Sequence, residues 1–305
     1  MIQLPTIGGG SMRKALGLAA VAIAAVLSGG ATLATDGYTG PVIDTHAHLR
    51  TSQTNGLTDA HPMGTAALRA LDAAAGVQRS ALIVMADKGD MPATRALNDA
   101  LLAAVAADPD HFYPIASVHP ADGDAALAEL ERLARLGVRE IKLHPNSQQL
   151  DVADPAVARV TEKAGELGMA VLFDSYNPMD TNQPGKLMML SFRQPGTNFI
   201  FAHMGFTEFR EFQSLATLRK LGRGGNVWLD VSAIASAYAG SPVAPELVWT
   251  LRRHGMDHVL FGSDWPVDTP AEALKAVRAL GLTAAEEKLV LHDNAVKLLK
   301  LDQGS

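Results

Sequence analysis

The stretch Val42-Ile-Asp-Thr-His-Ala-His48 decides the fold, because it joins a short apolar run to two histidines in an H-x-H pair. Similar apolar runs recur along the chain and alternate with Ala- and Leu-rich segments of helical period. This alternation is typical of parallel strand–helix–strand construction. The pattern predicts eight strands, at residues 42–45, 81–85, 113–118, 138–143, 170–173, 198–202, 227–231 and 258–262.

The segments between these runs carry the start and stop signals of helices. Asp122-Gly123-Asp124 predicts a helix over residues 125–136, and Asp154-Pro155 and Pro270 predict two more. Thr283 and Glu286 have the spacing of a capping box, in which each side chain bonds the backbone of the other residue. Helices therefore separate the predicted strands.

The connections are unequal on the two sides of the strands. Those before the strands are short and contain glycine, whereas residues 49–61 and 175–194, which follow strands, are long and irregular. A TIM barrel has this asymmetry, because its active site is built from the loops after the strands. A doubly wound sheet usually has a Gly-rich phosphate turn after its first strand, where this chain has Asp44 to His48. We therefore predict an α/β fold, a (β/α)8 TIM barrel, as a single domain over residues 36–305.

The first 35 residues differ in kind from the rest. Arg13-Lys14 precedes an uncharged run from Ala15 to Leu27, and small residues follow at 28–31. This is the layout of a secretory signal peptide, and the run is shorter than the ~20 residues of a membrane span. We expect residues 1–35 to be a signal peptide and leader, and the mature chain to be periplasmic or secreted. The run ends like a lipoprotein cleavage box but has Gly30 in place of the lipidated cysteine, so no membrane anchor is expected after cleavage.

Composition limits the partners and the chemistry. With 26 basic and 32 acidic residues, a net charge of -6 and no basic run, the chain lacks the positive surface of a nucleic-acid binder. The absence of cysteine excludes disulfides, thiolate metal sites and cysteine nucleophiles. Any metal must therefore be held by His, Asp or Glu.

Histidines follow several of the predicted strands. Those that do so, together with one aspartate, are His46, His48, His119, His144, His203 and Asp264. Because the carboxyl ends of barrel strands share one mouth, these side chains are expected to converge. Alternate residues of a strand share a face, so His46 and His48 can reach one ion. Imidazole and carboxylate donors suit Zn²⁺, Mn²⁺ or Fe²⁺.

Five motifs in register carry a resemblance to a known family. They are Val42–His48, Ile141-Lys-Leu-His-Pro145, Ala202-His-Met-Gly205, Phe261-Gly-Ser-Asp-Trp-Pro266 and Asn294–Leu299. Together they resemble the amidohydrolase-related TIM-barrel family (amidohydrolase family 2) of the amidohydrolase superfamily, over nearly all of residues 41–300. The family includes metal-dependent hydrolases, lactonases and non-oxidative decarboxylases.

The resemblance implies one divalent metal ion held by His46, His48 and Asp264, with His203 near the reacting group. Relatives usually supply a histidine from strand five, where this chain has Asp174. We expect Asp174 to take that ligand position, in a site for Zn²⁺ first, although the second carboxylate shifts preference towards Mn²⁺ or Fe²⁺. The alternative is a site without metal, as in the lactonase branch that resembles this family.

Basic side chains at the same mouth predict a small anionic substrate. Lys142 and His144 share one strand face, and we interpret them, with Arg50, as groups that bind or orient an anion. In other branches of the superfamily a strand-four lysine is carboxylated and bridges two metals. That alternative fits less well, because the Lys-Leu-His-Pro motif of this family is normally mononuclear.

The leading hypothesis is a metal-dependent hydrolase of a small organic-acid lactone, ester or amide. Asp264 would move the proton of a metal-activated water, and His203 would polarise the scissile carbonyl. The alternatives are a decarboxylase of the same family, a metal-free lactonase and a non-catalytic small-molecule-binding barrel. A pocket rich in Arg and aromatic rings would favour decarboxylation, and an aromatic content of 5% favours hydrolysis.

Overall fold

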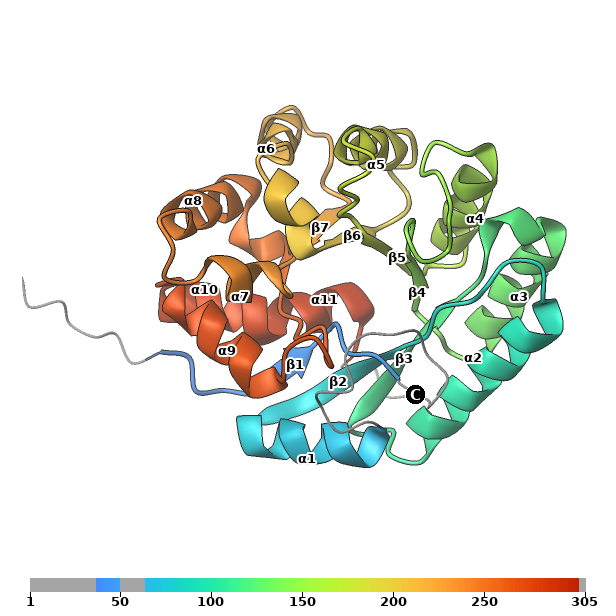
Figure 1. Cartoon of the computed structure of the whole chain (residues 1–305), viewed down its shortest axis with the longest axis horizontal. Helices are drawn as coiled ribbons and strands as arrows, with labels where there is room; N and C mark the ends of the chain where they lie inside the picture. The colour runs from blue at the N-terminus through green and yellow to red at the C-terminus, as the bar shows by residue number, and fades with distance from the viewer. Residues whose placement is uncertain (1–36, 50–63, 302–305) are drawn as a thin grey trace, which may run out of the picture. The chain divides into compact units, whose positions relative to one another are not determined.

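The computed structural model describes residues 37–49 and 64–301, and these residues contain eight parallel strands in one sheet (Figure 1). The strands are β1 (Val42–Asp44), β2 (Val77–Ile83), β3 (Phe112–Ser117), β4 (Glu140–Leu143), β5 (Ala170–Asp174), β6 (Phe199–Ala202), β7 (Val227–Asp230) and β8 (Val259–Leu260). Each strand pairs with the next along the chain, in the order β1 to β8. All eight predicted strands are confirmed, and their arrangement is consistent with a TIM barrel.

The segments after β1 and β8 are joined by backbone hydrogen bonds. The Thr45 N–H donates to the Phe261 carbonyl at 2.9 Å, and the His48 N–H donates to the Trp265 carbonyl at 2.9 Å. The sheet therefore curls until the residues that follow its first and last strands are neighbours.

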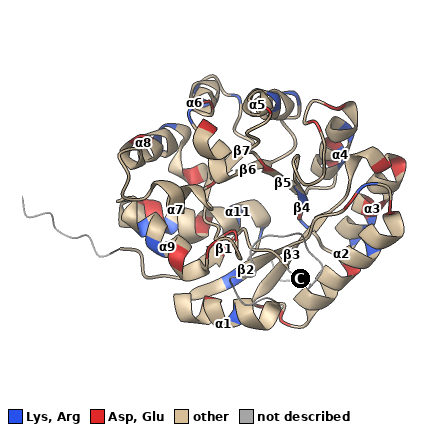
Figure 2. Ribbon diagram, viewed as in Figure 1, with Lys and Arg blue, Asp and Glu red and all other residues tan. Residues whose placement is uncertain are grey.

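Helices alternate with the strands and surround the sheet (Figure 1). They are α1 (Thr65–Ala75), α2 (Met91–Ala106), α3 (Asp124–Arg135), α4 (Pro155–Glu166), α5 (Gln183–Arg193), α6 (Gln213–Lys220), α7 (Ile234–Tyr238), α8 (Ala244–His254), α9 (Pro270–Ala279), α10 (Ala284–Lys288) and α11 (Asn294–Leu299). Charged residues occur on many of these helices (Figure 2). In the described part of the chain, no helix has both the length and the apolar character needed to cross a membrane.

The predicted helix signals act as expected, with one correction. The capping box of Thr283 and Glu286 is formed at α10, and Thr269 and Glu272 form a second one at α9. The prediction that residues 175–194 form an irregular loop is wrong, because α5 occupies more than half of them. Its buried face includes Leu187 and Leu190, a helical spacing that was present in the sequence. Of the other predicted loop, residues 50–61 lie outside the described residues, as does the predicted signal peptide.

Strand alternation divides the core into two apolar clusters and aims the polar residues inward. On β5, Val171 and Phe173 belong to the cluster between the sheet and most of the helices, whereas Ala170 and Leu172 belong to a second cluster that includes Ala295 and Leu299 of α11. Asp174 continues the inner set at the carboxyl end of the strand. The same alternation places Lys142 of β4 and Asp230 of β7 on the inner face.

Candidate active site

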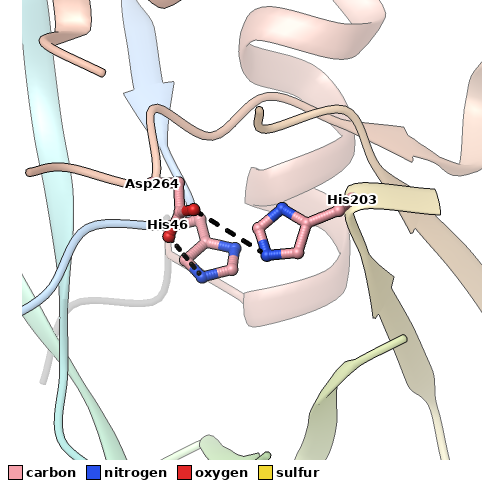
Figure 3. A group of neighbouring side chains, drawn as sticks. All are labelled: His46, His203 and Asp264. Carbon is pink, nitrogen blue, oxygen red and sulfur yellow. Dashed lines mark ion pairs between the residues drawn. The ribbon is translucent and has the colours of Figure 1, made fainter. Parts of the chain in front are cut away.

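The imidazoles of His46 and His48 and the carboxylate of Asp264 meet where β1 and β8 end (Figure 3 shows His46 and Asp264). Asp264 Oδ1 lies 3.3 Å from His46 Nε2 and 3.2 Å from His48 Nε2. Donor atoms bound to one tetrahedral ion at 2.0–2.1 Å are about 3.3 Å apart. Each of these two distances therefore has the length expected between two ligands of one ion.

The backbone after β8 holds Asp264 in this position. The Asp264 N–H donates to the His46 carbonyl at 2.6 Å, and Asp264 has a φ of 58°. Such a left-handed conformation is uncommon outside glycine, although aspartate adopts it more readily than most residues. Two residues earlier, a Cβ on Gly262 would lie 2.5 Å from His46 Cβ. Only glycine fits there, because the histidine packs directly against the backbone of the chain after β8.

His203 comes from the end of β6 and faces the same point (Figure 3). Its Nε2 lies 3.8 Å from Asp264 Oδ2 and 3.5 Å from Asp174 Oδ2. Burial alone would lower the pKa of His203, but the charges of Asp264 and Asp174 outweigh burial and raise that pKa to about 9. Among the described residues, His46, His203 and Asp264 are the trio whose ligand atoms all lie within 4.8 Å of one another.

Asp174 lies between two imidazoles on the other side of His203. Its Oδ2 is 3.2 Å from His144 Nε2, and its Oδ1 accepts the Tyr176 N–H at 3.2 Å. Burial would raise the pKa of Asp174, yet the neighbouring His203 and His144 hold that pKa well below its usual range. The aspartate is thus an ionised group at the mouth, and its role as a metal ligand stays a prediction.

Lys142 reaches the centre of the site from β4. Its side chain is 1% exposed, and its Nζ lies 3.3 Å from His46 Nε2. Burial, and next the charge of Lys142, hold the pKa of His46 well below its ordinary value. His46 is therefore neutral, as a metal ligand must be. The lysine ammonium faces the same nitrogen lone pair that a metal ion would use.

His119 bonds to groups outside this cluster. Both ring nitrogens of His119 are engaged elsewhere, because Nε2 lies 2.7 Å from the Gln148 carbonyl and Nδ1 accepts the Ala121 N–H at 3.1 Å. His119 therefore follows β3 as predicted, but its ring caps the turn after that strand and contacts the segment after β4 instead of His46 or Asp264. Arg50 lies outside the described residues.

Two functional residues were missed from the sequence, and both come from β7 or just after it. Asp230 Oδ2 lies 2.6 Å from His46 Nδ1, and Ser232 Oγ lies 3.2 Å from the same atom. Ser232 Oγ is also 3.1 Å from His203 Nδ1. Asp230 lies at the carboxyl end of the predicted strand 227–231 and is the last residue of β7, so the available signal was its position. The predicted site did not include Asp230, because it was chosen mainly from the histidines that follow strands.

Aromatic side chains gather after three consecutive strands. The ring of Phe206 lies 5.4 Å from that of Tyr176 and 6.1 Å from that of Tyr238, measured between centroids. These residues follow β6, β5 and β7 respectively. A low overall aromatic content therefore does not exclude an aromatic wall at the mouth.

The chain thus combines an eight-stranded parallel α/β fold with histidines and aspartates at the carboxyl ends of the strands, and three of them, His46, His203 and Asp264, could hold a metal ion. Residues 43–301 match the family described as Amidohydrolase (Amidohydro_2), and the chain belongs to that family. The resemblance inferred from the five motifs is confirmed.

Several solved structures are similar in fold. A dihydroxybenzoic acid decarboxylase from Polaromonas sp. JS666, with bound manganese and the inhibitor 2-nitroresorcinol, is 19% identical, with a TM-score of 0.68 over 87% of this chain and 98% of that one. A putative 2-pyrone-4,6-dicarboxylic acid hydrolase from Pseudomonas putida is 22% identical, with a TM-score of 0.66 over 86% of this chain and 98% of that one. A 2,6-dihydroxybenzoate decarboxylase complexed with 2,6-dihydroxybenzoate is 18% identical, with a TM-score of 0.68 over 87% and 99%. No curated protein matches the sequence.

Proposed function

We propose that the protein is a metal-dependent hydrolase of a lactone, ester or amide of a small organic acid. The observation that carries this proposal is the position of the Asp264 carboxylate, whose Oδ1 lies 3.3 Å and 3.2 Å from the Nε2 atoms of His46 and His48. Its Oδ2 faces His203 at 3.8 Å. A single carboxylate thus connects the candidate metal ligands to a third imidazole that can meet the substrate.

Imidazole and carboxylate donors suit one divalent ion, and His46 and Asp264 belong to the described group whose ligand atoms lie within 4.8 Å of one another. His46, His48 and Asp264 are its first three ligands, and Asp174 is the proposed fourth. We favour Zn²⁺, with Mn²⁺ or Fe²⁺ as the alternatives that a second carboxylate would favour. When bound, such an ion lowers the pKa of a coordinated water towards about 7 and so supplies a nucleophile at neutral pH.

Asp264 and His203 would carry out the proton transfer and the polarisation of the carbonyl. The pKa of Asp264 is well below its usual range, because His203 and His46 outweigh the effect of burial, so its carboxylate is ionised and can accept a proton. Asp264 takes the proton of the attacking water and returns it to the leaving group. His203, whose pKa is raised to about 9, is protonated at neutral pH and can donate a hydrogen bond to the scissile carbonyl.

The charge of Lys142 and the ring of His144, whose pKa burial lowers to about 4, would select the substrate. Lys142 and His144 lie at the site, and we propose that they and Arg50 bind or orient the acid group of the substrate. Two proteins of similar fold bind small aromatic molecules, 2-nitroresorcinol in one and 2,6-dihydroxybenzoate in the other. We therefore propose a small anionic molecule as the substrate.

The Asp264→Asn variant tests the proton transfer. Turnover of lactones, esters or amides should be abolished while most of the metal is retained, because the amide can ligate through oxygen but cannot carry the proton. The control is Asp257→Asn, which changes a half-exposed aspartate near the amino end of β8. Intact turnover in Asp264→Asn would remove Asp264 from this role.

A decarboxylase is the second candidate, and the aromatic wall of Tyr176, Phe206 and Tyr238 favours it. Flat rings at the mouth can stack on an aromatic or conjugated acid. In that reaction the same ion would bind the carboxylate, and Asp264 or His203 would protonate the carbon. Incubating the metal-loaded protein with aromatic acids and with lactones, and measuring released CO₂ beside released acid, separates the two functions.

We also propose that the chain is exported and that residues 1–35 are removed. The proposal rests on the order of a basic pair, an apolar run and small residues in this segment. Expression of the full chain in a bacterial host, followed by fractionation and sequencing of the amino terminus, tests it. A mature start near residue 36 in the periplasm or medium supports export, and an intact leader in the cytoplasm contradicts it.

A further inference from the structure

We propose that Asp230 and Ser232 are positioning residues that hold the imidazoles of His46 and His203 with their Nε2 atoms directed at the reaction centre. The consequence for metal binding rests on the proposed function, whereas the consequence for the two rings does not. Neither residue contacts the candidate metal ligands through the atoms that would bind the ion. Both act from behind the rings, on the Nδ1 side.

The hydrogen bonds of Asp230 determine which nitrogen of His46 carries a proton. Its side chain is fully buried. Asp230 Oδ1 accepts the Ser232 N–H at 2.7 Å, and Oδ2 accepts the Ser232 hydroxyl at 2.9 Å. Oδ2 also lies 2.6 Å from His46 Nδ1. A carboxylate only accepts, so His46 Nδ1 carries the proton. The lone pair of His46 is then on Nε2, which faces Asp264.

The groups around His203 Nδ1 likewise determine that this nitrogen carries a proton. The Ser232 hydroxyl gives its one proton to Asp230, so at its 3.1 Å contact with His203 Nδ1 the oxygen is the acceptor. The backbone carbonyl of Ser232 is a second acceptor for the same nitrogen, at 3.1 Å. His203 Nδ1 therefore also carries a proton, and its Nε2 faces Asp174 and Asp264.

Asp230, the last residue of β7, and Ser232 thus fix the rings of His46 and His203, which follow β1 and β6. The two rings stack with centroids 5.0 Å apart, and Ser232 Oγ lies within 3.2 Å of Nδ1 in both. Gly262 leaves the space for this arrangement, since a Cβ there would lie 3.1 Å from Asp230 Oδ1 and 3.2 Å from Ser232 Cβ. A change in Asp230 or Ser232 is therefore expected to disturb a metal ligand and a catalytic residue together.

The Asp230→Asn variant tests the proposal sharply. An amide has one acceptor end and one donor end, whereas both oxygens of Asp230 face donors. The backbone N–H of Ser232 cannot move its proton, so the new NH₂ group must face His46. His46 must then shift its proton from Nδ1 to Nε2, the nitrogen that would bind the metal. Affinity for Zn²⁺ should fall by about 10- to 100-fold, as is typical for the loss of a partner behind a ligand.

Two measurements on the protein carry the test. Long-range ¹H–¹⁵N NMR of the metal-free, histidine-labelled protein identifies the protonated nitrogen of each ring, with His46→Gln and His203→Gln for assignment. We expect His46 to be protonated on Nδ1 in the unmodified chain and on Nε2 in Asp230→Asn. The second measurement is the dissociation constant for Zn²⁺, from titration against a competing chelator.

The chain offers a matched control in a second buried Asp, His and Ser group. Asp72 Oδ2 lies 2.7 Å from His111 Nε2 and accepts the Ser80 hydroxyl at 2.8 Å. Asp72→Asn makes the same chemical change away from the mouth, so it should leave the His46 tautomer and the Zn²⁺ affinity unchanged. An equal loss of affinity in both variants would mean general destabilisation and would overturn the proposal.

The outcomes also separate this proposal from the proposed function. If the unmodified chain binds no metal but His46 is protonated on Nδ1 and shifts in Asp230→Asn, the hydrolase proposal fails and the positioning role stands. If the unmodified chain has His46 protonated on Nε2, the positioning role is overturned without any variant, whatever the metal content.

Discussion

His46 and Asp264 are joined twice, once through the backbone and once through their side chains. The Asp264 N–H donates to the His46 carbonyl at 2.6 Å, and Asp264 Oδ1 lies 3.3 Å from His46 Nε2. The same pair ties the chain after β1 to the chain after β8. The contact between the first and last segments of the barrel therefore also fixes the spacing of two candidate metal ligands.

Replacing Gly262 should lower both the stability of the fold and the affinity for the metal. In Gly262→Ala the added Cβ would lie 2.5 Å from His46 Cβ, and neither backbone can move freely. We expect the free energy of unfolding to fall by about 1–3 kcal/mol, the usual cost of overpacking a core, and Zn²⁺ affinity to fall as well. Chemical denaturation and metal titration measure the two effects. Gly185→Ala is the control, because a Cβ there meets nothing within 4 Å, and equal behaviour of the two variants would contradict the account.

Removing the charge of Lys142 should strengthen metal binding. Its buried ammonium lies 3.3 Å from His46 Nε2 and so competes with a cation for that nitrogen. In Lys142→Met we expect Zn²⁺ to bind about 10-fold more tightly, which is about 1.4 kcal/mol of repulsion removed. Titration with a competing chelator measures the change.

The opposite result would have a definite meaning. Loss of metal in Lys142→Met would show that the lysine helps to hold the ion, as a carboxylated lysine does in other branches of the superfamily. Lys163→Met is the control, since Lys163 forms its ion pair with Glu131 on the outer helices. Its metal affinity should not change.

Stability should fall in mild acid because of His254, which ends α8. A helix carboxyl end favours a cation, but burial, followed by the charge of Arg219, lowers the pKa of His254 to about 3. The unfolded chain takes up this proton near pH 6.5, whereas the folded chain does not. The stabilisation is therefore complete above about pH 6.5 and is lost as the pH falls towards about 3.

Urea unfolding at about pH 7.5 and about pH 5 measures this effect, with an expected loss of about 2 kcal/mol from His254. In His254→Gln the residue cannot be protonated, so the loss between the two pH values should shrink by that amount. An identical pH dependence in the variant and the unmodified chain would mean that His254 does not contribute. The metal-free protein should be used in both cases.

The strand pattern and the motifs could be predicted because they depend on local sequence. Apolar alternation identifies a strand, and the position just after it identifies the mouth of a barrel, which is why the sequence places His46, His48, His203 and Asp264 there. The helix α5 was not predicted because it begins with Gln183-Pro-Gly-Lys186, which is typical of a loop. Its apolar face becomes evident only from its packing against the rest of the fold.

Other features depend on contacts between distant segments. Nothing near Asp230 shows that its carboxylate meets His46, since the two residues are 184 positions apart in the chain. His119 has the same strand-end position as the site histidines, yet nearby carbonyl and N–H groups satisfy its ring. Position at a strand end therefore selects candidates, and hydrogen-bond partners decide among them.

Metal content of the chain lacking residues 1–35, measured by elemental analysis beside the Asp174→Ala variant, tests the central claim most directly. The account predicts about one Zn, Mn or Fe per chain, falling sharply in the variant because Asp174 completes the ligand set. Metal retained in the variant would confine Asp174 to its contacts with His144 and His203. No metal after metal-replete expression would contradict the hydrolase proposal, and would leave a metal-free lactonase or a small-molecule-binding barrel as the function to test.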